Sequence, residues 1–84
     1  MNIVNYACPC CRHLTLSEAP PGTYEICPVC FWEDDPSQFE DRDADVGANA
    51  VSLRVAQANF AEFGASERQF LEQVRGPHAN EIPI

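Results

Sequence analysis

Hydrophobic positions follow a helical spacing in residues 51–76. The first apolar stretch begins after Ser52, a candidate N-cap that Val51 precedes as a possible hydrophobic staple, and it ends before Gly64, where a left-handed residue would close a helix. The second opens at residues 66–69, which match a capping box, and stops at residues 76–77, Gly-Pro. The two apolar stripes consist of Leu53, Ala56, Phe60 and Phe63, then of Phe70, Leu71 and Val74. The pattern predicts a helical hairpin over residues 51–76.

Shorter runs suited to β-strands occur in the N-terminal third. Residues 13–17 and 23–26 are two such runs, and the Pro-Pro-Gly sequence within residues 18–22 between them is a strong turn signal. We expect these runs to pair as an antiparallel hairpin, to which residues 3–6 could add a third strand. Residues 34–50 are acidic and poor in structure-forming residues, which indicates a loop.

Chain length and cysteine content suggest that the fold needs a cross-link. The chain has 84 residues, too few to build a large apolar core, and it contains five cysteines. The N-terminus lacks the basic and apolar runs of a signal peptide, and no apolar run approaches the roughly 18 residues of a membrane span. We therefore expect a cytoplasmic protein, whose thiols stay reduced and available to a metal rather than forming disulfides.

The charge of the chain argues against two classes of partner. The formal net charge is −8, and the five basic residues are scattered arginines. Nucleic-acid binding depends largely on basic side chains that neutralise phosphates, and an anionic membrane surface attracts the same side chains. We expect neither nucleic acid nor a membrane as a partner.

Four cysteines have the spacing of a metal site. Cys8 and Cys11 form one C-x₂-C pair, 15 residues follow, and Cys27 and Cys30 form the second pair. A two-residue gap lets the backbone turn around a metal ion with both sulfurs facing it. Proline after the first cysteine of each pair stiffens that turn. Four thiolates leave no open coordination position, which favours a structural Zn²⁺ site, with a rubredoxin-like iron as the alternative.

The fifth cysteine, Cys10, allows three interpretations. It is a buried thiol within the first turn, or it replaces Cys11 as a ligand, or it is a redox-sensitive thiol that pairs with Cys11 and releases the metal. Residues 27–30 also have the form of a dithiol oxidoreductase motif, but they lack the βαβ surroundings that this chemistry uses.

The remaining candidate sites are weaker. Residues 41–45 resemble the start of a calcium loop, but Val46 and Ser52 stand where glycine and glutamate are needed. Residues 33–36 are expected to form a surface turn, unless their acids accept hydrogen bonds from the helical hairpin or meet a basic partner. His13 and His78 are isolated spare ligands at most. No catalytic arrangement is recognisable, so we do not expect an enzyme.

Several stretches of the chain resemble the bacterial cysteine-rich CPCC domain family. The stretches that carry the resemblance are residues 6–11, 15–16, 21–35, 47–49, 52–53 and 59–64. Arg12 departs from the family pattern, which usually has glycine after the first cysteine group. The resemblance implies a bacterial, stand-alone, metal-binding domain and supplies no activity.

These observations together predict an α+β fold with a small zinc-ribbon-like β-hairpin packed against a C-terminal two-helix hairpin. We expect one domain over residues 1–76, made of parts 1–33, 34–50 and 51–76, and a tail at 77–84. Phe31 and Trp32 either cover the metal site or anchor a partner. The core is expected to contain Phe31, Trp32, Leu53, Phe60, Phe63, Phe70, Leu71 and Val74.

The function expected from these features is that of an acidic, zinc-binding, non-enzymatic module that binds a protein partner. Its acidity also permits a toxin-neutralising or phage-related partner. The alternative is a thiol-based redox or metal-responsive switch that uses Cys10.

Overall fold

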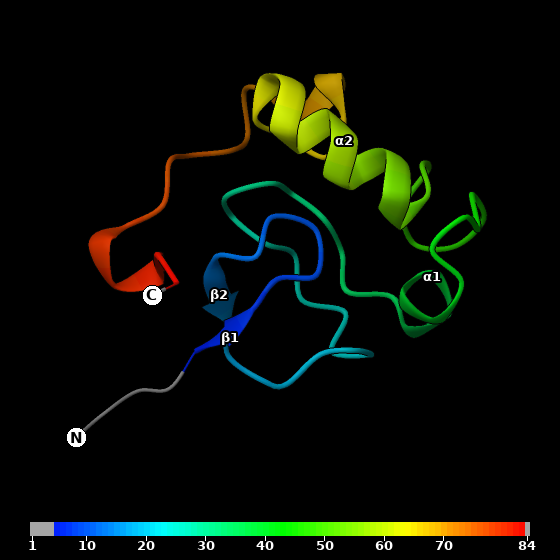
Figure 1. Ribbon diagram of the computed structural model, residues 1–84, viewed down its shortest axis with the longest axis horizontal. Coiled ribbons are helices and arrows are strands. Elements are labelled where there is room, and N and C mark those ends of the chain that lie inside the picture. The colour runs from blue at the N-terminus through cyan, green and yellow to red at the C-terminus, as the bar shows by residue number, and fades with distance from the viewer. Residues whose placement is uncertain (1–4, 84) are drawn as a thin grey trace.

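The computed structural model of the protein describes residues 5–83. It is a small α+β domain in which short regular elements alternate with long ordered loops (Figure 1). The elements are strands β1 (Tyr6–Ala7) and β2 (Leu14–Leu16), helices α1 (Pro36–Glu40) and α2 (Leu53–Phe63), and the 3₁₀ turns η1 (Arg68–Phe70) and η2 (Ala79–Glu81). None of the helices within this described part is long and apolar enough to cross a membrane.

Helix α2 begins and ends where the sequence predicts. The side chain of Ser52 accepts a hydrogen bond from the Val55 amide, which satisfies one of the free N–H groups at the helix start. Gly64 has a φ of 90°, and its amide donates to the carbonyl of Phe60. This is the left-handed helix end that glycine adopts without steric cost. The helix buries Leu53 and Ala56 against the cysteine-rich loops.

The strand pairing differs from the prediction. β2 pairs antiparallel with β1, around the first cysteine pair, rather than with residues 23–26. Residues 23–26 instead run beside residues 33–34, with an isolated bridge between Ile26 and Glu33 around the second pair. Each cysteine pair therefore closes its own loop, and a short loop costs less entropy than one that joins the two pairs. Of the predicted third strand at 3–6, Tyr6 lies in β1, and residues 3–4 lie outside the described part.

The expected second helix is wrong. Only η1 forms. The Ser66 amide donates to the Cys30 carbonyl at 2.7 Å, and the Ser66 carbonyl, which would accept the first intrahelical bond, accepts from the Asn59 side chain. The buried Ser66 hydroxyl caps nothing. The capping-box signal is overridden by contacts distant in sequence.

The acidic part, 34–50, contains structure that its composition did not indicate. Asp35 caps α1 and accepts hydrogen bonds from Ser37, and Pro36 occupies the first turn, where its missing N–H costs nothing. The Gln38 side chain is fully buried and binds both the backbone and the side chain of Asn49. Asp34 is only 1% exposed and accepts from Thr23. The expected surface turn at 33–36 is therefore wrong for Asp34 and Asp35, which are buried, while Glu33 and Pro36 are half-buried.

The apolar core centres on the cysteines rather than on the aromatic side chains. Among the expected core residues, Trp32 and Leu53 are fully buried, and Phe60 packs partly buried against them. Leu71 is exposed, which is a correction that follows from the missing helix. The other expected members are half-buried: Phe31, Phe63, Phe70 and Val74. The small core also contains Leu16, Val29, Ala56 and Ala65.

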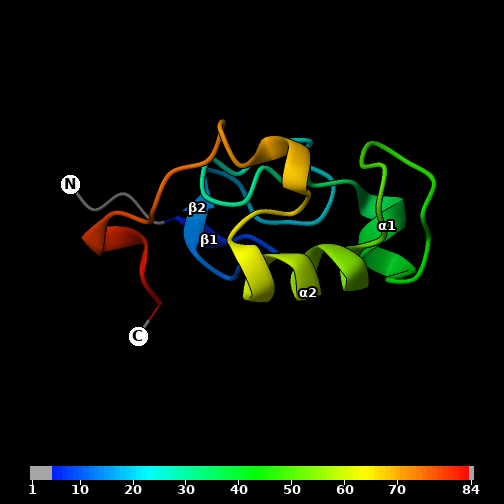
Figure 2. The ribbon, with the colours of Figure 1, turned by 90° about the horizontal axis from the view of Figure 1, so that it is seen from above.

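The C-terminal segment returns to the cysteine-rich part of the molecule. Figures 1 and 2 show residues 71–83 leading away from α2 and back to the side of β1 and β2. The amide of Arg75 donates to the carbonyl of Pro28, and η2 contacts β2. The Glu81 side chain is almost buried there and pairs with the Arg75 guanidinium.

Candidate metal centre

The backbone makes the same turn around each cysteine pair. In the first turn the Cys8 amide donates to the His13 carbonyl at 2.9 Å, and the Arg12 amide donates to the Cys8 carbonyl at 2.8 Å. In the second, the Cys27 amide donates to Trp32 at 2.9 Å, and the Phe31 amide donates to Cys27 at 2.7 Å. The two cysteine pairs therefore lie in backbone turns with the same hydrogen-bond pattern.

The last position of each turn has a left-handed backbone. Arg12 has a φ of 70° and Phe31 a φ of 69°. Residues other than glycine rarely adopt this conformation, because their Cβ approaches the backbone closely. The φ of Arg12 nevertheless matches that of Phe31 to within 1°. The first turn therefore has the same geometry as the second, even though arginine stands where glycine was expected.

The four cysteine sulfurs converge on one point. The Sγ atoms of Cys8, Cys11, Cys27 and Cys30 all lie within 4.8 Å of one another. The Cys8 and Cys30 sulfurs are 3.6 Å apart, and the Cys11 and Cys27 sulfurs are 3.7 Å apart. A tetrahedral Zn²⁺ with bonds of about 2.3 Å places its sulfurs about 3.8 Å apart. The cluster is therefore able to hold a metal ion of that size.

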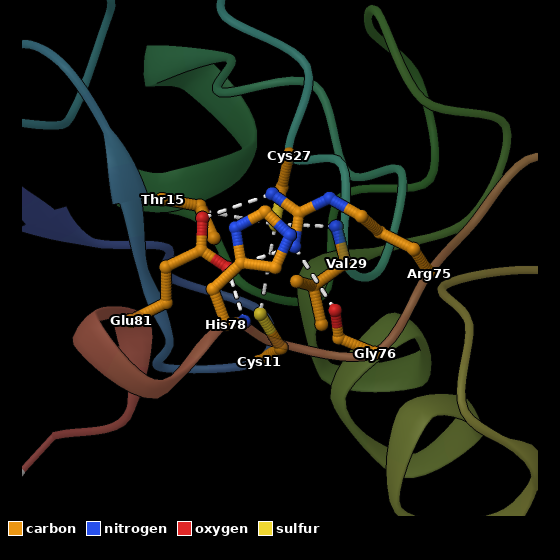
Figure 3. Close-up of polar contacts among 8 residues, drawn as sticks. All are labelled: Cys11, Thr15, Cys27, Val29, Arg75, Gly76, His78 and Glu81. Atoms are coloured by element: carbon orange, nitrogen blue, oxygen red, sulfur yellow. Dashed lines mark hydrogen bonds and ion pairs between the residues drawn. The ribbon is translucent and has the colours of Figure 1, made fainter.

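Burial and hydrogen bonds orient the sulfurs. All four ligand candidates are buried, with Cys27 and Cys30 inaccessible. The hydroxyl of Thr15 lies 3.0 Å from the Cys27 sulfur. Figure 3 draws Thr15 and Cys27 together with Cys11. The amides of Val29 and Trp32 each donate to a sulfur at 3.4 Å. Such partners hold thiolate ligands in place and offset part of their negative charge.

The thiols perturb one another. The pKa of Cys27 is lowered well below its ordinary value, chiefly because Cys11 and then the other thiols donate to its thiolate. The pKa values of Cys8 and Cys11 are raised, mainly by Cys11 and Cys27 respectively, and that of Cys30 is raised mainly by Cys10. A metal that binds all four sulfurs must displace the protons that these thiols carry.

Cys10 lies outside this group of four. It takes the place in the first turn that Val29 takes in the second, and both side chains are buried. The geometry thus joins Cys11, rather than Cys10, with the other three sulfurs.

The other candidate residues lie apart from the cluster. The His13 ring meets Phe60 edge-on at 5.9 Å, and His78 is exposed in the C-terminal segment. The acidic residues 41–45 form a mostly exposed loop, in which Asp43 pairs with Arg54. Phe31 packs on Phe70 with ring centroids 4.6 Å apart. Thr15 was not predicted as a site residue, because its position relative to the cysteines in the sequence does not indicate that its hydroxyl contacts a sulfur.

Comparison with known proteins identifies the family. A search of curated proteins finds no match. The family model described as Cysteine-rich CPCC matches residues 6–81, which include both cysteine turns, α2 and the returning C-terminal segment. Residues 8–11, Cys-Pro-Cys-Cys, are the motif of that description. The chain therefore belongs to the cysteine-rich CPCC family.

Proposed function

We propose that this protein binds a single Zn²⁺ ion through Cys8, Cys11, Cys27 and Cys30, and that the ion is structural. The observation that carries the proposal is the closed set of four buried sulfurs with separations close to those of a zinc tetrahedron. Substrate would have to displace a ligand to reach the metal, so a catalytic role is disfavoured. The five free thiols also suit a reducing compartment such as the cytoplasm.

Native mass spectrometry of the untagged chain, kept in reductant, tests this assignment. The expected result is one zinc per chain and a colourless protein. The matched variants are Cys11→Ser, which should lose the metal, and Cys10→Ser, which should retain it. A metal-free native protein, a bound iron, or zinc retained equally by both variants would contradict the proposal.

We further propose that the loaded domain is a non-enzymatic module that binds a protein partner. Its support is the net charge of −8, to which four thiolates and one Zn²⁺ add two more negative charges, and a set of exposed apolar side chains. These side chains are Tyr6, Tyr24, Ile26, Val46, Val55, Leu71 and Ile82. Capture experiments with loaded and with chelated protein test this role. A protein retained only by the loaded form supports it, and recovery of nucleic acid with steep salt dependence would contradict it.

The redox alternative depends on Cys10. Peroxide would take two electrons from Cys10 and Cys11, forming their disulfide and water, and the metal would leave. The position of Cys10 next to the ligand candidate Cys11 favours this alternative, but the 5% exposure of Cys10 disfavours access of an oxidant. The test compares zinc release by peroxide from the natural chain and from Cys10→Val, in which valine matches Val29 at the same place in the second turn. Equal release from the variant and the natural chain rules out the switch.

A further inference from the structure

Three of the five arginines have partners within the molecule. Arg54 pairs with Asp43 at 2.7 Å, and Arg75 pairs with Glu81 at 2.8 Å. The guanidinium of Arg68 lies 4.4 Å from the centre of the Phe63 ring. Within residues 5–83, the guanidinium groups of the other two, Arg12 and Arg42, form no ion pair or hydrogen bond.

Both unpaired arginines line the same cavity. The cavity has a volume of about 240 Å³ and is the space between the first cysteine turn, residue 20, the end of α1, and the start of α2. Its walls between the two arginines are mainly apolar, with Pro9, Pro20, Phe39 and Leu53 as the main contributors. In an acidic chain, two arginines without an ion pair among the described residues thus border the same mainly apolar hollow.

The fold holds the two arginines at this place. Arg12 stands at the left-handed end of the first turn, so its position depends on the cysteine cluster. Arg42 follows α1, and its carbonyl accepts from the Arg54 amide at 3.0 Å, which ties it to the first turn of α2. The Gln57 side chain donates to the Pro9 carbonyl at 2.9 Å and joins α2 to the first cysteine turn. Figures 1 and 2 show α1 beside the start of α2.

We propose that this cavity binds a carboxylate that is carried on a small apolar group. A guanidinium fork matches the planar carboxylate and binds it with two parallel hydrogen bonds. The apolar walls suit an aliphatic body, and they disfavour a strongly hydrated anion such as phosphate. The volume exceeds the roughly 150 Å³ of an apolar cavity that holds benzene, so a leucine-sized group fits. Such a carboxylate has two sources, a free organic acid or the C-terminus of a peptide.

Binding of N-acetyl-leucine to the zinc-loaded full chain, measured by titration calorimetry, tests the proposal. The expected result is binding that is lost with N-acetyl-leucinamide and weakens as salt rises. Arg42→Gln should reduce the affinity at least about tenfold, because a charge-assisted hydrogen bond is lost. Arg12→Gly should do the same, and glycine suits the left-handed backbone of that position. Arg68→Gln removes an equal charge elsewhere and should leave the affinity unchanged.

A peptide that ends in leucine, with a free or an amidated C-terminus, distinguishes the two sources. Binding of the free-ended peptide alone assigns the cavity to a chain terminus, and binding of N-acetyl-leucine assigns it to small acids as well. Binding of neither probe overturns the proposal. So does equal binding of acid and amide, or an affinity that both arginine variants leave unchanged. Zinc content of each variant checks the fold, and Arg42→Gln, remote from the cysteine ligands, decides the matter if Arg12→Gly fails to load.

Discussion

A single hydroxyl contact illustrates how individual side chains support the metal centre. Thr15 reaches the Cys27 sulfur from β2, and Cys27 is the thiol whose pKa is lowered. Hydrogen bonds to a ligand stabilise its ionised form, and loss of such a partner typically costs 10- to 100-fold in metal affinity. The hydroxyl of Thr15 would therefore strengthen metal binding at this cluster without contacting the metal itself.

We predict that Thr15→Val releases zinc to a chelator about tenfold faster than the natural chain, because valine keeps the shape and removes the donor. Transfer of zinc to a coloured chelator measures the rate. Thr23→Val is the control, since that hydroxyl donates to Asp34 and not to a sulfur. Its release rate should match that of the natural chain. Equal rates for the two variants would show that the Thr15 contact has no effect on the metal.

At the level of single residues, the ligand candidates were accessible from sequence and their supporting partners were not. The two-residue gap in each cysteine pair is a local constraint that any reader of the chain can recognise. The contact of Thr15 depends on how β2 meets the second turn, and that meeting involves residues 12 apart. Arg12 and Phe31 could not be read as left-handed, because their side chains give no signal for that conformation.

Among the elements, α1 depends on one carboxylate. Asp35 accepts from the amide and hydroxyl of Ser37 at one oxygen, and from the Ala48 amide at the other. These bonds lower the pKa of Asp35, with the Ala48 amide as the largest cause. A Cβ on Gly47 would lie 2.6 Å from the Asp35 carboxylate, so the loop approaches the cap as closely as glycine allows. One side chain thus joins the start of α1 to the loop that precedes α2.

Replacement of Asp35 by alanine should cost about 2–3 kcal/mol of unfolding free energy, because α1 loses its cap and the Ala48 amide loses its acceptor in the same change. Urea unfolding of zinc-loaded protein measures the change. Asp41→Ala serves as the control, since Asp41 is exposed and, among the described residues, its carboxylate accepts only from the Asp43 amide. Surface substitutions usually change the free energy of unfolding by no more than about 0.5 kcal/mol. A loss below about 0.5 kcal/mol for Asp35→Ala, or equal losses for both variants, would contradict this account of α1.

The C-terminal turn is held by an ion pair whose strength depends on pH. The two terminal guanidinium nitrogens of Arg75, Nη1 and Nη2, donate to the Glu81 carboxylate at 2.8 and 2.9 Å (Figure 3). The His78 amide donates to the same carboxylate. These contacts, with Arg75 as the largest cause, lower the pKa of Glu81 from 4.5 to about 2. Because the folded pKa is the lower one, the contribution is complete above pH 4.5 and disappears as the pH falls toward 2.

We expect Glu81→Gln to lose about 1 kcal/mol at neutral pH, since the pair is partly open to solvent. The difference between the variant and the natural chain should stay constant from about pH 8 to about pH 5 and shrink below about pH 4.5. Unfolding followed across this range tests the sign, and comparison of the two chains cancels the shared effect of acid on the cysteines. A difference that grows on acidification would refute the pairing.

The elements whose start and stop residues lie in their own sequence could be predicted. The elements whose bounds or partners depend on contacts distant in the sequence could not. α2 has a cap at Ser52 and a stop at Gly64, both within its own sequence. The second helix did not form beyond η1: the Ser66 carbonyl, which would accept the first intrahelical bond, accepts from the Asn59 side chain instead. β2 took β1 as its partner because the first cysteine turn brings the two strands together. The Asp-Pro start of α1 was present in the sequence, but the acidity around it suggested a loop.

The whole molecule is built around sulfur. Its buried apolar cluster contains all five cysteines and few large side chains, with Trp32, Leu16, Leu53 and Val29 as the main ones. The buried network around Gln38 organises the loops rather than adding apolar area. A core of this size stabilises so short a chain only weakly.

We predict that removal of the metal by a chelator, in reductant, unfolds the protein. Ligation of structural zinc supplies on the order of 10 kcal/mol, which is comparable with the whole stability of a small domain. Loss of circular dichroism and a red shift of the Trp32 emission should follow zinc release together, and added zinc should restore both. A chelated chain that keeps its dichroism and a cooperative thermal transition would show that the core suffices alone.

The order of residues along the chain has a consequence for biosynthesis. All four converging cysteines lie within the first 30 residues, and the segments that close over them, α2, Ser66 and the turn at Glu81, are made later. An ion can therefore be captured by the nascent chain while its sulfurs are still open to solvent, before translation delivers the segments that cover them. In the finished protein, exchange of an ion bound in this way would be slowed by the later segments, which contact both the second cysteine turn and β2.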